Sequence, residues 1–218
     1  MLKIASALLL SVLAGSAGAQ TFLSASLTNA AENPPTVPTT AGGQPRPASF
    51  GTASFFIDSA ASFMTFTATI FNIDVTGAQT PNDINDNLTN AHIHAGPLVT
   101  PTTNGGVVWG FFGSPLNDTA PNDFVFTPFV TGVGGTFSGK WDMAEGNATT
   151  LTAQLPNILA GRSYINFHTT QFGGGEIRGN LVVAIPEPET YALMLGGLAL
   201  VAGVARRRAR GGRAPSSA

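Results

Sequence analysis

The sequence contains no cysteine. This excludes disulfide bonds, thiolate nucleophiles, and zinc or iron–sulfur sites built on cysteine. Charge is also scarce, because only 10% of the residues are Asp, Glu, Lys or Arg, against about 25% in a typical soluble domain. The polarity of the surface must therefore come mainly from Thr, Ser, Asn and Gln.

Basic residues are nearly missing from the middle of the chain. Residues 20–185 hold four basic and ten acidic side chains, a net charge of −6, whereas Lys3 and five arginines between Arg206 and Arg213 lie in the end segments. Contacts to nucleic-acid phosphates need clustered Lys and Arg. We therefore expect no nucleic-acid partner for the middle region.

The first 19 residues have the pattern of a secretory signal peptide. Lys3 precedes an apolar run from Ile4 to Leu13, and the small residues Ala17, Gly18 and Ala19 follow it. A short apolar run that ends in small residues is typical of a cleaved signal. We predict export, with cleavage between Ala19 and Gln20.

The C-terminal end carries a second candidate targeting signal. Pro186, Glu187 and Pro188 precede an apolar stretch over 191–205, and the cluster Arg206, Arg207 and Arg208 follows it. A bare membrane anchor would have the same apolar and basic parts. The ordered combination over residues 186–218 resembles the bacterial PEP-CTERM sorting signal. The resemblance implies a short transmembrane helix that holds the chain briefly in the inner membrane, processing by an exosortase-type enzyme, and release to the cell surface or an extracellular matrix.

Residues 20–185 read as one β-rich domain. Several short segments alternate apolar and polar residues, for example Leu23, Ala25 and Leu27 in "FLSASLT" and Met64, Phe66, Ala68 and Ile70 in "FMTFTATIF". Such segments, separated by turn residues, indicate eight or nine strands. The expected fold is all-β, an immunoglobulin-like or Greek-key β-sandwich or a partly closed barrel.

One segment departs from this alternation. In "TTLTAQLPNILAG" the apolar residues follow helical spacing, with Thr149 or Thr150 as the N-cap and Gly161 as the stop. Pro156 should shorten or kink this single short helix. Three polar segments, residues 31–47, 76–90 and 113–123, are predicted to be long loops.

Polar side chains gather on one face of three predicted strands. Alternation places them in three groups: His92 with His94; Tyr164, Asn166 and His168; and Glu176 with Arg178. If the strands are neighbours, these side chains form one cluster. Two interpretations remain open for it.

The first is a zinc or copper site with His92, His94 and His168 as ligands. The second is a structural polar cluster in which the imidazoles donate to loop carbonyls and Glu176 pairs with Arg178 or with a backbone amide. The hydrogen-bonded cluster is favoured, because Arg178 would compete for Glu176 and place positive charge beside an ion. The sequence offers no defensible nucleophile with a base, and we expect no enzyme activity and no catalytic residues.

The motifs "AHIHAG", "NGGVVWGFF", "LAGRSYINFHT" and "GGGEIRGNL" occur in an order and spacing that resemble the CHRD domain. The resemblance covers about residues 22–183. It implies an immunoglobulin-like or related β-sandwich without an established catalytic activity. We therefore expect an exported binding or structural module of the bacterial envelope or matrix, with an extracellular protein or polysaccharide as its partner. The alternative is a zinc- or copper-binding protein or metalloenzyme.

Overall fold

The structure is a computed structural model, and it describes residues 20–184 and 188–211. The chain divides into two compact units, residues 1–183 and 184–218, and each is considered by itself. The predicted signal segment with Ala19 lies outside the described residues, as do Pro186 and Glu187 of the sorting motif. Gln20 is the first described residue and is exposed.

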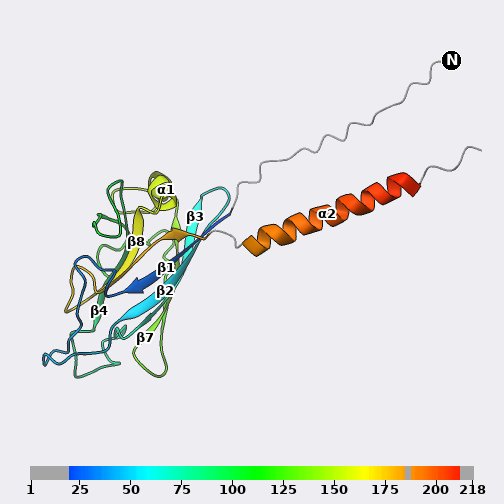
Figure 1. Cartoon of the computed structure of the whole chain (residues 1–218). Helices are drawn as coiled ribbons and strands as arrows, with labels where there is room; N and C mark the ends of the chain where they lie inside the picture. Colours follow the sequence, from blue (N-terminus) through cyan, green and yellow to red (C-terminus); the bar gives the residue numbers. More distant parts are fainter. Residues whose placement is uncertain (1–19, 185–187, 212–218) are drawn as a thin grey trace, which may run out of the picture. The chain divides into compact units, whose positions relative to one another are not determined.

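The first unit is built from antiparallel strands and one short helix (Figure 1). Its elements are β1 (Thr21–Thr28), β2 (Phe50–Ile57), β3 (Phe63–Phe71), β4 (Leu88–Ala95), β5 (Val107–Phe112), β6 (Val125–Pro128), β7 (Gly134–Asp142), α1 (Leu151–Leu159), β8 (Ser163–Thr169), β9 (Ile177–Asn180) and β10 (Val182–Val183). The expected all-β class with a single short helix in this domain is confirmed.

The strands form one curled sheet. Their order is β5-β4-β8-β9-β1-β2-β3-β7-β6, and β10 pairs with β1 beside this path. The curl brings distant strands face to face, since Phe66 of β3 packs on Trp109 and Phe111 of β5 at centroid distances of 5.7 and 4.6 Å. The fold is therefore the partly closed barrel of the two expected architectures.

The alternation read from the sequence identifies the core correctly. Leu23 and Leu27 of β1 and Phe66 and Ile70 of β3 are at most 3% exposed. The residues between them, such as Ser24 and Thr67, are exposed on the outer face. Burial of apolar area contributes about 25 cal/mol per Å², so this pattern fixes which face of each strand turns inward.

Helix α1 begins where the Thr pair predicts. Thr150 is the N-cap, and its Oγ1 accepts a hydrogen bond of 3.2 Å from the backbone N–H of Ala153. Leu151 and Ile158 are buried beneath the helix. Gly161 follows the helix with φ of +70°, a conformation that glycine adopts without strain.

The second unit contains helix α2 (Pro188–Gly211), which includes Pro188, Arg206, Arg207 and Arg208 of the predicted sorting motif. Among residues 20–184 and 188–211, no helix has the length and apolar character needed to cross a membrane. The expected transmembrane helix is therefore not supported. The apolar stretch over 191–205 falls short of the roughly 20 residues that a span needs.

Candidate metal centre

The three strands that carry the predicted polar residues are neighbours in the sheet, in the order β4-β8-β9. His92 lies opposite Asn166, His94 opposite Tyr164, and Asn166 opposite Arg178. Directly opposed residues of antiparallel strands project to the same face. The register therefore brings the three histidines together with Tyr164, Asn166 and Arg178, outside the barrel core.

Loops cover this face, so that both sides of β4 and β8 are buried where the histidines lie. His92, His94 and His168 are 4%, 8% and 6% exposed. The inner face of the same strands carries Ile93 and Ile165, which are fully buried in the core. The histidines thus occupy a second, polar interior between the sheet and the loops.

One nitrogen of each ring contacts a loop carbonyl, as the hydrogen-bonded interpretation expects. His94 Nδ1 lies 2.9 Å from the oxygen of Gly105, and His168 Nδ1 lies 2.9 Å from the oxygen of Gly173. His92 Nε2 lies 3.0 Å from the oxygen of Ser114. A carbonyl oxygen only accepts, so each of these three nitrogens carries the ring proton.

The Ser114 contact depends on a glycine in β5. A Cβ added to Gly110 would overlap the carbonyl oxygen of Pro115 and lie 3.0 Å from Cδ2 of His92. Because Gly110 has no side chain, the loop after β5 can fold back over His92. This places the Ser114 carbonyl within reach of the ring.

Burial favours the neutral form of all three rings. Burial, with a smaller contribution from the neighbouring histidines, lowers the pKa of His92 to about 4. Burial also lowers the pKa of His94 to about 4 and lowers the pKa of His168. At neutral pH each ring is therefore a neutral imidazole with one N–H and one lone pair.

The remaining nitrogens are thus three lone pairs with no proton among them. His92 Nδ1 faces His168 Nε2 at 3.1 Å, and His94 Nε2 is buried without a hydrogen-bond partner in the described part of the chain. If one ring proton moved to His92 Nδ1 or His168 Nε2, these two nitrogens would form a hydrogen bond. The nitrogen that lost the proton would then face its loop carbonyl with a lone pair, which is unfavourable. If the proton of His94 moved to Nε2, toward Asn166 Oδ1, which is also without a partner in the described chain, His94 Nδ1 would face the Gly105 carbonyl with a lone pair.

This donor set lies close to the dimensions of a metal site. One nitrogen from each of His92, His94 and His168 lies within 4.8 Å of the others. Zinc–nitrogen bonds are about 2.0 to 2.1 Å long, so two nitrogens on one ion are separated by at most about 4.2 Å. Small ring movements would close the site. The carbonyls of Ser114, Gly105 and Gly173 would act as the outer partners that fix each tautomer.

Arg178 lies in the cluster, as the sequence predicts, and in addition to burial its charge lowers the pKa of His94, but its guanidinium does not pair with Glu176. Its guanidinium donates to Asn104 Oδ1 at 2.8 Å and to the carbonyl of Thr100 at 2.6 Å. It also stacks on the ring of Tyr164, with Cζ 3.6 Å from the ring centroid. Tyr164 stacks in turn on His94 at 4.6 Å. Arg178 therefore holds the covering loop over the site.

The expected pairing of Glu176 with Arg178 is wrong. Glu176 is fully buried, and its carboxylate accepts from Arg46 at 2.5 Å, from Thr169 Oγ1 at 2.6 Å and from Ser49 Oγ. It is accordingly not a partner of the histidine rings in the described structure. One objection to the metal interpretation, competition for Glu176, is removed by this arrangement.

Sequence reasoning missed Glu32 at the edge of the site. Glu32 is buried, and its Oε2 accepts a hydrogen bond of 2.9 Å from Asn166 Nδ2. Burial raises the pKa of this carboxyl. The available signal was a Glu before Pro34 and Pro35 in a loop whose other charged residue is Arg46, but nothing in that pattern indicates Asn166 as its partner.

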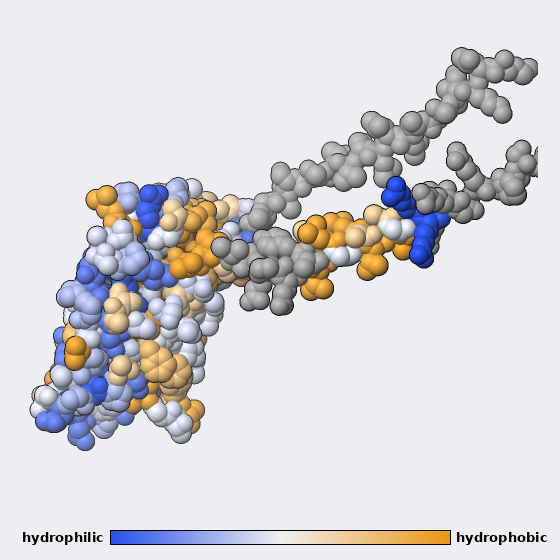
Figure 2. All heavy atoms as spheres, in the orientation of Figure 1, coloured by the Kyte–Doolittle hydropathy of each residue, from blue (hydrophilic) through white to orange (hydrophobic). Residues whose placement is uncertain are grey.

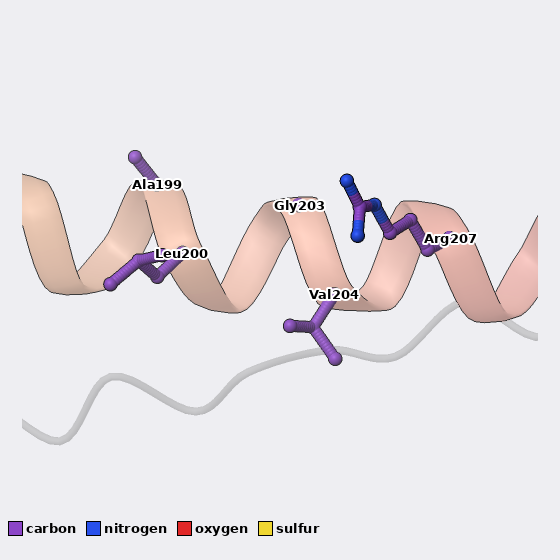
Figure 3. A pocket seen from close by; sticks show the side chains of 5 residues that line it. All are labelled: Ala199, Leu200, Gly203, Val204 and Arg207. Atoms are coloured by element: carbon purple, nitrogen blue, oxygen red, sulfur yellow. The ribbon is translucent and has the colours of Figure 1, made fainter.

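Helix α2 carries a shallow pocket that does not qualify as a site. Figure 3 shows Ala199, Leu200, Gly203, Val204 and Arg207 along one side of the helix. Among the residues that the structure describes, its lining comes from this helix alone. A single helix face cannot enclose a ligand, so the histidine cluster is the stronger candidate.

Comparison with protein families agrees with the sequence motifs. The family model described as the CHRD domain matches residues 23–181, and the model described as the PEP-CTERM protein-sorting motif matches residues 184–209. Comparison with curated proteins and with solved structures found no match. The histidine cluster lies entirely within the first match. The chain belongs to the CHRD-domain family and, through its PEP-CTERM motif, to the exported proteins that an exosortase-type enzyme processes.

Proposed function

We propose that the protein is an exported module that binds one zinc or copper ion through His92, His94 and His168. The observation that carries the proposal is the convergence of three neutral imidazoles, with one nitrogen of each ring within 4.8 Å of the others. His92 Nδ1 faces His168 Nε2, and His94 Nε2 has no hydrogen-bond partner in the described chain. Three imidazole nitrogens with fixed tautomers suit either metal. The role that we propose is ion binding.

The structural interpretation explains the three carbonyl contacts equally well, but it leaves the other three nitrogens unexplained. Buried polar atoms normally have partners. An ion would satisfy His92 Nδ1, His94 Nε2 and His168 Nε2 together without disturbing the contacts to Ser114, Gly105 and Gly173. This is why the described geometry favours metal binding over a purely hydrogen-bonded corner.

The test is metal binding by the purified full chain after treatment with a chelator. We expect it to take up one equivalent of Zn²⁺ or Cu²⁺. At a free ion concentration of 100 Kd, binding adds about 2.7 kcal/mol to the free energy of unfolding, which raises Tm by about 5 to 10 °C for a domain of this size. Mass spectrometry of the bound metal and thermal melts give the two readouts.

His94→Ala and His168→Ala should abolish both the uptake and the rise in Tm. Thr89→Ala is the matched control, because Thr89 lies on the same strand and is exposed. If neither ion is retained and neither changes Tm in the wild type, the histidines are a structural cluster only. Their alanine variants would then lower Tm without any metal-dependent effect.

We propose the cell surface or the extracellular matrix as the final location. The experiment is fractionation of cells that express the full chain, with mass spectrometry of its termini. The mature chain should begin at Gln20, end near Pro188, and appear outside the cytoplasm. Replacement of Pro186, Glu187 and Pro188 by alanine should block processing. Recovery of wild type in the cytoplasm with residues 1–19 and 186–218 intact would contradict the proposal.

A further inference from the structure

The outer face of strands β1, β2, β3 and β7 carries serine and threonine residues in register. Cross-strand pairing aligns them in two rows, Ser24-Ser54-Thr67-Ser138 and Ser26-Thr52-Thr69-Thr136. Neighbouring strands lie about 4.8 Å apart, and the two rows are about 7 Å apart along the strands. In the described chain, these eight hydroxyls make no side-chain hydrogen bond to another residue. They are therefore available to a ligand.

Phenylalanine rings flank the two rows at both ends. Phe22 packs on Phe56 at 5.2 Å at one end, and Phe50 stacks on Phe71 at 4.8 Å at the other. Phe22, Phe50 and Phe71 are nevertheless 54%, 48% and 37% exposed. The two ends are about 20 Å apart, because Phe56 lies six positions after Phe50 along an extended strand.

Figure 2 shows apolar ends and a more polar centre on the side of the domain that carries β1, β2 and β3. Apolar colour gathers toward both ends of this side, and paler residues lie between. Cross-strand aromatic pairs stabilise sheets, which accounts for the stacking. It does not account for six phenylalanines on a solvent face: Phe22, Phe56 and Phe63 at one end, and Phe50, Phe71 and Phe129 at the other.

Strands β1, β2 and β3 contain no charged residue. On the neighbouring strand β7, Lys140 and Asp142 lie at one end and pair with each other at 3.1 Å. A polyanion would find no cluster of positive charge here. Protein–protein interfaces usually have a continuous apolar centre. The centre of this face instead consists of Ser and Thr hydroxyl groups.

We propose that this outer face binds an extended neutral polysaccharide. The apolar C–H faces of sugar rings stack on the phenylalanines at the two ends of the face, around Phe22 and around Phe50. The negative face of an aromatic ring attracts polarised C–H groups. The sugar hydroxyls exchange hydrogen bonds with the two rows of Ser and Thr. This site is separate from the histidine cluster, which lies on β4 and β8, and it does not depend on metal binding.

The test is co-sedimentation of the purified full chain with powdered cellulose and chitin, which are neutral, and with calcium alginate beads, which are anionic. We expect binding to at least one neutral polymer and little to alginate. Phe50→Ser with Phe71→Ser removes one aromatic end, and Ser54→Lys with Thr67→Lys places charge in the rows. Each double variant should weaken binding about tenfold or more.

Val130→Ser is the matched control, because Val130 is fully exposed and lies in a loop outside the rows. His94→Ala should also leave binding unchanged, which separates this proposal from the metal site. Thermal melts identify any variant that fails to fold. If the Phe50→Ser, Phe71→Ser variant does not fold, the Ser54→Lys, Thr67→Lys variant still tests the proposal. The proposal is overturned if neither neutral polymer binds, if alginate binds equally well, or if folded variants bind like wild type. It is also overturned if the variants abolish only self-association.

Discussion

At the residue scale, the loop carbonyls that accept from the three histidines determine which nitrogen of each ring remains free to bind an ion. The His-x-His spacing predicts that the rings of His92 and His94 converge, and the structure confirms that they do. Which nitrogen of each ring is free depends on the carbonyls of Gly105, Ser114 and Gly173. These belong to loops whose path follows from no periodic pattern. The sequence therefore identifies the donors, but it favours the hydrogen-bonded cluster without information on which nitrogens the loop carbonyls occupy.

Asp118 offers a residue-scale prediction on pH. It is fully buried, and its Oδ2 has no hydrogen-bond partner in the described chain. Burial, with a smaller contribution from the neighbouring Asp123 and Glu145, raises the pKa of this carboxyl to about 6. Between the unfolded pKa of 3.8 and about 6, the folded chain holds more protons at this group than the unfolded chain does. Stability therefore falls as the pH rises through this range.

Asp118→Asn should remove this penalty and keep an acceptor for the N–H of Asp123, which bonds to Asp118 Oδ1 at 3.3 Å. Because the pKa rises from 3.8 to about 6 and one pKa unit corresponds to about 1.4 kcal/mol, we expect the variant to gain up to about 3 kcal/mol at pH 7 and nothing at pH 3.5. Urea unfolding at the two pH values measures the difference. An equal effect at both pH values, or a loss at pH 7, would contradict this account.

At the scale of elements, alternation succeeds wherever a strand is regular. It places the inner and outer faces of β1, β3, β4 and β8 correctly. It fails at Glu176, because the alternation was extended backwards from Arg178 past the start of β9 at Ile177. Glu176 lies outside the paired register of β8 and β9, which begins at Ile177, so alternation along the strand does not determine which side chains it meets.

The loops were located by composition, but their roles were not predictable. The segment 31–47 supplies Glu32 to the histidine site and Arg46 to Glu176. Both contacts join residues that are more than a hundred positions apart in the chain. Polar, Pro-rich composition indicates a loop, but it does not indicate which distant side chain the loop will meet. The length of the loop 76–90 was also overestimated, since β4 begins at Leu88.

At the scale of the whole domain, the strand order explains why the first and last segments depend on each other. β1 pairs with β2, β9 and β10, so strands from both ends of the domain lie side by side in the middle of the sheet. The ion pair between Arg46 and Glu176 ties the same two regions together beside this junction. Their side chains are 5% and 0% exposed. The pair therefore bears on the stability of the entire sheet.

We predict that Arg46→Met destabilises the protein by about 3 to 5 kcal/mol, because it leaves the buried carboxylate of Glu176 without its cation. Glu176→Gln should be similarly costly, since it leaves the guanidinium unpaired. The double variant should lose less than the sum of the two single variants. Chemical denaturation of all four proteins gives the coupling energy.

Lys140→Met is the control for this cycle. Lys140 pairs with Asp123 and Asp142 at 3.1 Å, but its side chain is 30% exposed. Solvent screens such pairs, so we expect this variant to change stability little. If Arg46→Met costs no more than Lys140→Met, the Arg46–Glu176 pair does not hold the two ends of the sheet together. A large loss with strong coupling would instead mean that loop 31–47, which also delivers Glu32 to the histidine site, is anchored by this one buried pair.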